Sequence, residues 1–247
     1  FALRQASLNG FDTCVNLLLR AKANVNSVDL HGQTPLWRAA RAGHIDTVHL
    51  LLMANAEVNM AKESDGTSPL YAAAQQGHLR LLRRLVGAKA DLDRPASNTG
   101  STPLMAASER GHVSSVQLLV NAKAAVNRHN AVYGTTATIY AAMCGHQQVL
   151  EALIKSKADV NLRNCRDCST PAFAAAVNNH ARALTCLIQA KADVNVADNT
   201  GDTPVRAAAW HGSAKAMQVL VAAKAELNKK YYGRTPRAWA KENGHEE

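Results

Sequence analysis

Histidine is the residue whose number and spacing in this sequence first suggest chemistry, because neutral imidazole is the commonest metal ligand in proteins. Five of the ten histidines recur at intervals of 34 residues, and a sixth follows after about twice that interval: His44, His78, His112, His146, His180 and His245. Successive copies would lie roughly 10 Å apart if each interval forms one packed helical layer. Zinc requires ligands about 2 Å from the metal. The row therefore cannot form one metal site, and we predict a structural use at a turn, with no metal and no cofactor.

The five cysteines include a single CxxC pair, Cys165 and Cys168. A zinc site would need a second pair or nearby histidines, so we interpret this pair as residues of a variable turn. Cys14 and Cys186 are expected to be small core residues of helices. An odd number of cysteines without disulfide spacing favours a reducing, intracellular compartment, and we expect the cytoplasm.

Catalytic arrangements are not found in the sequence. It contains no nucleophile–base pair, no HExxH motif and no glycine loop suited to phosphate, and its carboxylates are scattered. We therefore predict no catalytic residue and no enzyme activity. One alternative stays open: these residues could recruit substrate for an enzyme whose catalytic domain lies outside this sequence.

The basic residues offer a second interpretation. Lysine plus arginine is 28 and aspartate plus glutamate is 19, which leaves a net charge of +9. Six surplus charges form a row: Lys22, Lys89, Lys123, Lys157, Lys191 and Lys224. Such a row could bind nucleic acid or an anionic surface, but no aromatic platform or arginine-rich groove accompanies it. We favour a helix-end role, in which lysine interacts with the helix dipole, and keep the anionic binder as the alternative.

Regularly spaced side chains imply a repeated structural element, and residues 29–61 contain a complete copy of one. Thr34 can cap a helix because its hydroxyl accepts a free backbone N–H, and Pro35 suits the first helical position. Gly43 ends that helix because glycine enters the left-handed conformation freely. A second helix follows, in which Ile45, Val48, Leu51 and Leu52 form an apolar stripe at helical period.

The same pattern recurs along the whole chain. Its first-helix anchors stand 32 to 34 residues apart: Phe1, Thr34, Ser68, Thr102, Thr136, Thr170, Thr203 and Thr235. A glycine follows nine residues after each anchor except in the sixth copy, which has Asn179, the next-best residue for a left-handed helix end. We expect one continuous all-α array of eight repeats, partial at both ends: residues 1–28, 29–61, 62–95, 96–129, 130–163, 164–197, 198–229 and 230–247.

The segments TPLWRAARAGH, SPLYAAAQQGH, TPLMAASERGH and TPVRAAAWHGS resemble the first-helix motif of ankyrin repeats. The resemblance covers essentially the whole chain and implies a solenoid of paired antiparallel helices joined by hairpin turns. It also implies a protein–protein interaction module. Two departures stand out: lysine replaces the usual glycine after the second helix, and Ala137 and Thr138 replace proline and leucine in the fifth repeat, which we expect to be locally softer.

In ankyrin arrays the hairpin tips and the exposed ends of the first helices line a concave face. The resemblance therefore implies that binding side chains stand at those positions. Trp210 is notable there, because the matching positions of earlier repeats carry Arg41, Gln75 and Glu109. Tryptophan, tyrosine, methionine and arginine dominate interface energetics, and they concentrate in repeats five to eight. The predicted partner-binding residues are Arg41, Gln75, Gln76, Glu109, Arg110, Tyr133, Met143, Arg166, Asp167, Trp210, His211, Tyr231, Tyr232 and Arg234.

The sequence thus predicts a scaffold that binds a protein partner, in a transient complex or as an accessory subunit, with no requirement for self-association. No run of residues approaches the roughly 18 apolar residues of a membrane span. Phe1 falls inside a repeat, so we expect the true N-terminus upstream, which leaves organelle targeting open. Asparagines precede the hairpins and are expected to hold these turns by side-chain to backbone hydrogen bonds: Asn26, Asn59, Asn127, Asn161, Asn195 and Asn228.

Overall fold

The computed structural model describes residues 1–245. Within this range the chain forms fifteen helices, and the extended pairing there amounts to one isolated bridge between Tyr231 and Arg234. The chain divides into two compact units: the N-terminal unit, Phe1–Ala125 with Asn130–Val132, and the C-terminal unit, Val126–His129 with the residues from Tyr133 onward. The predicted all-α class is confirmed, whereas the arrangement of all eight repeats in one array stays a prediction.

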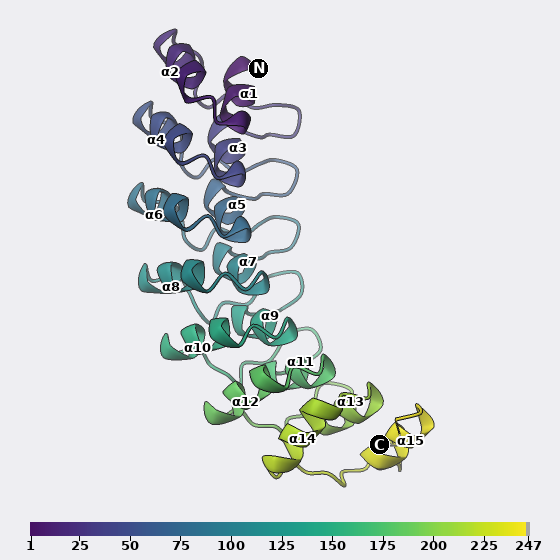
Figure 1. The fold of residues 1–247 in the computed structure, drawn as a ribbon. Helices are drawn as coiled ribbons and strands as arrows, with labels where there is room; N and C mark the ends of the chain where they lie inside the picture. The colour runs from purple at the N-terminus through teal and green to yellow at the C-terminus, as the bar shows by residue number, and fades with distance from the viewer. Residues whose placement is uncertain (246–247) are drawn as a thin grey trace. The chain divides into compact units, whose positions relative to one another are not determined.

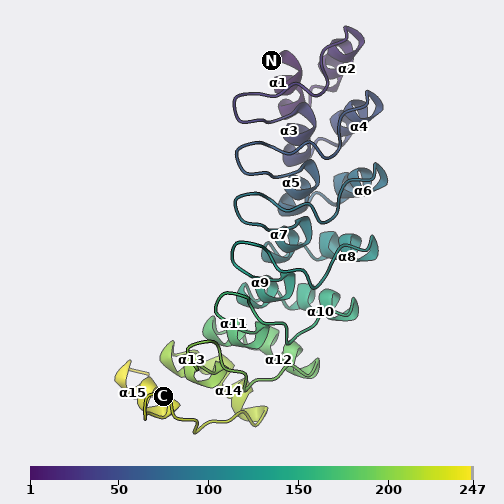
Figure 2. The same ribbon diagram turned by 180° about the vertical axis from the view of Figure 1, so that it is seen from behind.

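The N-terminal unit consists of four helix pairs in two layers. The first helices stack on one another in one layer, the second helices lie beside them in another, and loops project from the opposite side of the first-helix layer (Figures 1 and 2). The first helices are α1 (Ala2–Asn9), α3 (Pro35–Ala42), α5 (Pro69–Gln76) and α7 (Pro103–Glu109). The second helices are α2 (Asp12–Arg20), α4 (Ile45–Met53), α6 (Leu79–Gly87) and α8 (Val113–Asn121).

The C-terminal unit repeats this construction. Its first helices are α9 (Ala137–Met143), α11 (Pro171–Val177), α13 (Pro204–Trp210) and α15 (Pro236–Glu242). Its second helices are α10 (Gln147–Lys155), α12 (Ala181–Gln189) and α14 (Ala214–Ala222). Helix α15 packs on α13.

Each first helix after α1 begins with the predicted cap. The hydroxyl of Thr34 accepts the N–H of Trp37 at 3.0 Å, and Pro35 occupies the first helical position. The same side-chain bond starts the other six helices, at Ser68, Thr102, Thr136, Thr170, Thr203 and Thr235. Such a cap is worth about 1 kcal/mol, so the anchors seen in the sequence set where each layer begins.

The first helices end in left-handed turns against which an imidazole packs. Gly43 has φ 88°, and a Cβ placed on it would lie 2.8 Å from the ring of His78 in the next repeat. The same ring donates from Nε2 to the carbonyl of Arg41 at 3.1 Å. His44 and His112 bond the preceding repeat in the same way. The predicted structural use of the histidines is confirmed, and it links neighbouring repeats.

The sixth and seventh repeats depart from this pattern together. Asn179 replaces glycine with φ 56°, as predicted, and Ser213 replaces histidine in the repeat that packs on it. The Ser213 hydroxyl donates to the carbonyl of Val177 at 3.0 Å, the bond that imidazole makes elsewhere, and Asn179 Oδ1 accepts the N–H of Ala216. A smaller residue on one side therefore makes room for a larger one on the other.

The lysine row lies at the ends of the second helices. All six lysines have φ between 57° and 76°, and Asn55 occupies the same position in the second repeat with φ 60°. A left-handed conformation costs a residue with a Cβ roughly 1–2 kcal/mol. The row therefore supplies a helix-ending turn, which supports the structural interpretation of these lysines.

The asparagines before the hairpins make side-chain to backbone bonds, but to a different partner from the one predicted. Asn59 Oδ1 accepts the N–H of Asp91 at 2.8 Å, so it bonds the next repeat rather than its own turn. Asn26, Asn127, Asn161 and Asn195 make the equivalent bond, and Asp93 replaces asparagine in the third repeat. These side chains connect layers because the backbone of the next turn passes within reach.

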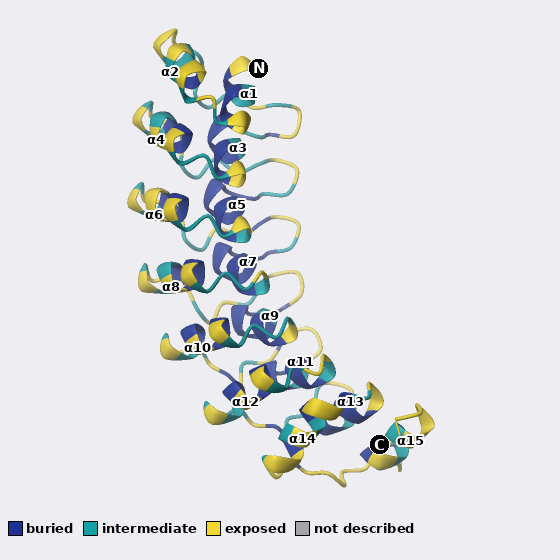
Figure 3. Cartoon of the chain, in the orientation of Figure 1, coloured by how far each residue is buried: buried dark blue, intermediate teal, exposed yellow. Residues whose placement is uncertain are grey.

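The core of each unit is formed by leucine and alanine facing between the layers, where Figure 3 shows the buried residues. Cys186 is buried there as expected, but Cys14 is exposed: α2 packs on α1 and α4, and these contacts leave the Cys14 side chain uncovered. Thr138 is also buried, and its hydroxyl has no hydrogen-bond partner. An unpaired buried hydroxyl costs about 1–3 kcal/mol, which fits the expectation of a softer fifth repeat.

The coupling between Asn179 and Ser213 is testable by a double-mutant cycle. We expect Ser213→His alone to lower the free energy of unfolding by about 1–3 kcal/mol, because the ring would collide with the Asn179 side chain. Combining it with Asn179→Gly should recover most of that loss, leaving a coupling energy of at least about 1 kcal/mol in urea titrations. Additive effects of the two substitutions would contradict this account.

The strain in the lysine row is testable at Lys157. Lys157→Gly should raise the free energy of unfolding by about 0.5–1 kcal/mol, since the relief of left-handed strain exceeds the added entropy of glycine. Lys155→Gly is the matched control: it changes the last residue of α10 and should lower stability by up to about 1 kcal/mol. Thermal and urea unfolding would show whether the signs differ.

Candidate functional site

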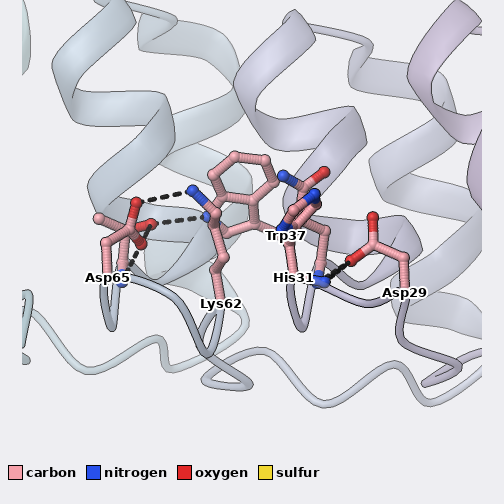
Figure 4. Close-up of polar contacts among 7 residues, drawn as sticks. Asp29, His31, Trp37, Lys62 and Asp65 are labelled. Atoms are coloured by element: carbon pink, nitrogen blue, oxygen red, sulfur yellow. Dashed lines mark hydrogen bonds and ion pairs between the residues drawn. The ribbon is translucent and has the colours of Figure 1, made fainter.

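In the N-terminal unit, a charged hairpin precedes α3. Asp29 Oδ1 accepts the N–H group of His31 at 2.9 Å (Figure 4) and that of Gln33 at 2.9 Å. Its Oδ2 pairs with the Arg38 guanidinium at 2.6 Å. Partial desolvation opposes ionisation of Asp29, yet these donors lower its pKa from 3.8 to about 2. The carboxylate therefore holds both the tip of the hairpin and the start of α3.

Trp37 lies between this hairpin and the next one (Figure 4). Its side chain is buried, and its indole N–H donates to the Thr67 hydroxyl at 3.1 Å. The Lys62 ammonium stands 5.2 Å from the ring centroid and pairs with Asp65 at 2.7 Å, while Arg41 approaches the ring at 5.6 Å. Such cation–π contacts add about 0.5–1 kcal/mol each at accessible sites. The contacts of Trp37 with Thr67 and Lys62 join two repeats, and Arg41 lies next to the same ring.

The predicted binding residues of the N-terminal unit lie at the ends of its first helices. Arg41, Gln76 and Arg110 are exposed, whereas Gln75 and Glu109 are half-buried. The carbonyl of Gln75 accepts the His112 ring, as the carbonyl of Arg41 accepts His78. At Arg41 and Gln75 the backbone carbonyl therefore links neighbouring repeats, and the side chain takes no part in that bond.

The C-terminal unit contains an aromatic cluster built around one arginine. The Arg206 guanidinium lies 4.3 Å from the Tyr231 ring, 5.1 Å from Trp239 and 5.2 Å from Trp210. The Trp210 and Trp239 rings are 5.2 Å apart, which joins α13 to α15. A guanidinium stacked on several aromatic faces is held in one place, so we call these four residues the aromatic–arginine cluster.

Two carboxylates pair with the arginines that contact the aromatic rings. Arg206 forms an ion pair with Asp202. Burial raises the pKa of Asp202, and the nearby Asp198 raises it further, while Arg206 lowers it. Arg234 stands 4.9 Å from the Trp239 ring and pairs with Glu242 at 2.7 Å. Two arginines therefore contact the Trp239 ring: Arg206, which is half-buried, and Arg234, which is exposed.

The remaining predicted residues of the C-terminal unit are solvent-accessible to different degrees. Tyr232 is 82% exposed, Tyr133 43%, Met143 39% and Trp210 38%, whereas Tyr231 is half-buried against Tyr232. The other predicted residues of this unit are exposed: Arg166, Asp167, His211 and Arg234. Asp167 also fixes its own hairpin, because its carboxylate accepts the N–H of Ser169. Trp210 thus both packs on the cluster and presents part of its indole to solvent.

Sequence reasoning missed Arg206 and Trp239. A signal was present in the columns of the repeat. The residue three positions after the anchor is apolar in repeats two to six and becomes Arg206 in the seventh: Trp37, Tyr71, Met105, Ile139 and Phe173 precede it. A charge in an otherwise apolar column requires a local partner, and the aromatic rings with Asp202 provide it.

Comparison with known proteins matches these features to one family. The sequence model described as "Ankyrin repeats (3 copies)" matches residues 3–96, 76–164 and 172–247. The crystal structure of the human ASB11 ankyrin repeat domain is similar in fold, with a TM-score of 0.80 and 21% sequence identity over 90% of this chain and 97% of that chain. The chain belongs to the ankyrin-repeat family. Ankyrin repeats are protein–protein interaction modules and are typically non-catalytic.

Membrane-spanning helices, metal clusters and the CxxC pair were the remaining features of interest in the sequence. Across residues 1–245 no helix is both long and apolar enough to cross a membrane. In the same range no three His, Cys, Asp or Glu side chains gather as a metal site would require. Cys165 and Cys168 are free thiols in a hairpin, where Cys168 has φ 60°. Other hairpins have glycine at the Cys168 position, for example Gly66 and Gly100.

The acid titration of Asp29 tests the geometry of its hairpin. A lowered pKa means that the contribution of Asp29 to stability is complete above about pH 4 and is lost as the pH falls towards about 2. Carboxyl ¹³C NMR should give a titration midpoint well below 3.8. The Asp29→Asn variant should melt below the wild type at pH 7, and the difference should shrink towards pH 2. A midpoint near 4 would contradict the hydrogen bonding described.

Proposed function

We propose that this chain is a non-catalytic scaffold that binds a protein partner through its hairpin tips and first-helix ends, especially those of repeats five to eight. The observation that carries the proposal is the aromatic–arginine cluster, which presents Trp210 and the neighbouring Tyr232 to solvent. Tryptophan, tyrosine and arginine are the residues most enriched among binding hot spots. Their gathering at variable positions of a repeat scaffold supports recognition there.

The rigidity of the cluster favours binding. Ordering a mobile side chain on association costs about 0.5–1.5 kcal/mol. Trp210 is already held by Trp239 and Arg206, so little of this cost remains when a partner covers its exposed edge. Tyr232 rests on Tyr231 in an edge-to-face contact with centroids 4.3 Å apart. The two exposed rings therefore offer apolar area that is already ordered.

Charged residues around the rings would orient the partner. Arg166 and Arg234 are exposed, and Asp167 adds an acceptor close to Arg166. Tyr133, Met143 and His211 complete the proposed contact set of the C-terminal unit, together with half-buried Tyr231. In the N-terminal unit the proposed contacts are Arg41, Gln75, Gln76, Glu109 and Arg110.

The setting we propose is intracellular and cytoplasmic, because Cys14, Cys165, Cys168 and Cys186 are thiols that form no disulfide in the described part of the chain. We further propose that the eight repeats act as one array and bind without self-association. Partner binding could be transient or permanent, as an accessory subunit of a larger complex. The positive φ of the lysine row favours a turn-forming role over an anion-binding one, so no second function is proposed for it.

The proposal is testable by comparative affinity purification. Proteins retained by the wild-type chain should be lost from Trp210→Ala and Tyr232→Ala, and the purified partner should bind each variant at least about tenfold more weakly. The control is Val221→Ala, which truncates another exposed apolar residue, 49% accessible, on the second-helix layer. It should bind like the wild type.

Folding must be checked because Trp210 packs on Trp239. Tyr232→Ala removes a ring that is 82% exposed, so its melting temperature should stay close to that of the wild type. Unchanged affinity in both variants, or an equal loss in Val221→Ala, would overturn the proposed surface.

A further inference from the structure

The outer side of α6 carries three arginines on one helical face. Arg80, Arg83 and Arg84 stand at positions i, i+3 and i+4, and all three are exposed. The opposite face of α6 is fully buried through Leu81 and its neighbours Leu82 and Leu85. Figure 3 shows the exposed residues of α6 on the side facing away from α5. Residues at this spacing are neighbours on a helix surface, so their charges form one basic face.

This basic face is particular to α6. The position of Arg84 is apolar in all six other second helices: Leu17, Leu50, Leu118, Ala152, Cys186 and Val219. At the positions that match Arg80, Arg83 and Arg84, no other second helix has more than one lysine or arginine. The matching residues are Arg182 in α12 and Lys215 in α14, and α4 has a histidine, His49. The fold does not require three arginines on this helix face, because most residues at these positions in the other second helices are apolar or neutral.

The arginines have no acidic partner in the described part of the chain. None of the salt bridges within residues 1–245 includes them, and Asp46 on α4 is not paired with them. Among the described side chains, Arg84 makes one polar contact, in which its Nη1 donates to Nδ1 of His49 at 3.2 Å. Like charges at i and i+4 destabilise a helix. A cost of this kind, uncompensated within the fold, indicates an external anionic partner.

The surroundings of the arginines favour a protein over a nucleic acid. Met53 lies one turn after His49 on α4 and is 72% exposed. His49 in turn contacts Arg84, so the thioether and the guanidinium groups share one surface. Exposed methionine beside arginine is typical of protein interfaces. No phenylalanine, tyrosine or tryptophan ring, on which bases of a single strand would stack, is among the exposed residues of α4 and α6.

We propose that Arg80, Arg83 and Arg84, with Met53 beside them, form a second docking surface for an acidic segment of a partner protein. Carboxylates of that segment would accept paired hydrogen bonds from the guanidinium forks, an arrangement stronger than a bond between neutral groups. This surface lies on the second-helix layer of the N-terminal unit. It uses none of the residues assigned to the partner surface of repeats five to eight, so it does not depend on that assignment.

Fluorescence anisotropy with a fluorescein-labelled octaglutamate peptide tests the proposal on the whole chain. The variant R80Q/R83Q/R84Q should bind this probe at least about tenfold more weakly than the wild type. The matched control Lys155→Gln, Arg182→Gln and Lys215→Gln removes the same charge from exposed residues of α10, α12 and α14. It should change affinity less than about twofold, because the removed charges are dispersed.

Two further measurements keep the result interpretable. The melting temperature of R80Q/R83Q/R84Q should equal or exceed that of the wild type, because repulsion within α6 is relieved. Arg84→Leu restores the residue type of the other repeats and should keep the fold while weakening peptide binding several-fold.

Duplex DNA and phosphatidylserine vesicles are measured in parallel. Tighter binding of either than of octaglutamate at physiological salt, with the same loss in R80Q/R83Q/R84Q, would assign the surface to nucleic acid or membrane and overturn a protein partner. Failure of the wild type to bind octaglutamate, or equal losses in the arginine variant and the lysine-containing control, would overturn the docking surface altogether.

Discussion

A helix pair of this length cannot cover its own apolar surface, so each repeat depends on contacts from the repeats beside it. The first-helix end shows how this dependence is met at the level of atoms. In repeats such as the second and third, the left-handed residue is glycine, an imidazole of the next repeat fills the space of the missing Cβ, and the ring donates to a carbonyl two residues before the glycine. The side chain at that carbonyl takes no part in the bond and differs between repeats: it is Arg41 in one repeat and Gln75 in another. Backbone atoms at these positions thus serve the stack, and side chains can vary without breaking it.

The residues best suited to recognition are those that break a column of the repeat. Arg206 replaces an aromatic or aliphatic residue, and Arg84 replaces an apolar one. The positive charges of Arg206 and Arg84 are compensated in different ways. Arg206 is enclosed by three rings and paired with Asp202, so its charge is compensated inside the unit. Arg84 contacts only a histidine among the described side chains, and its charge is compensated by solvent. An internally compensated arginine stiffens a surface, whereas an uncompensated one leaves electrostatic attraction available to a partner.

Local structure was predictable because its causes lie within a few residues of each other. A Thr-Pro pair predicts a capped start, and glycine or asparagine nine residues later predicts a left-handed end, as Asn179 confirms with φ 56°. Contacts between repeats were harder, because a pattern inside one repeat does not say which neighbour a side chain reaches. Asn59 was assigned to its own turn and bonds the next repeat instead. Cys14 was assigned to the core and is exposed, since burial depends on which helices cover α2. The identities of the candidate binding residues followed from position, while the stacking of Arg206 required coordinates.

Because the repeat length is nearly constant, some contacts between repeats can be predicted from the sequence. If one asparagine bonds a backbone N–H 32 residues later, its counterparts in other repeats face the same distance, and the observed bonds span 31 or 32 residues. Two simultaneous departures from the repeat pattern are then informative, because a residue that changes in one repeat must be accommodated by the residue that it contacts in the next repeat. Asn179 and Ser213 stand 34 positions apart in contacting columns, and both changed. An unmatched departure carries the opposite meaning: among the described residues Arg84 contacts a histidine of α4 and pairs with no carboxylate, so its charge is balanced by solvent and stays available to a partner.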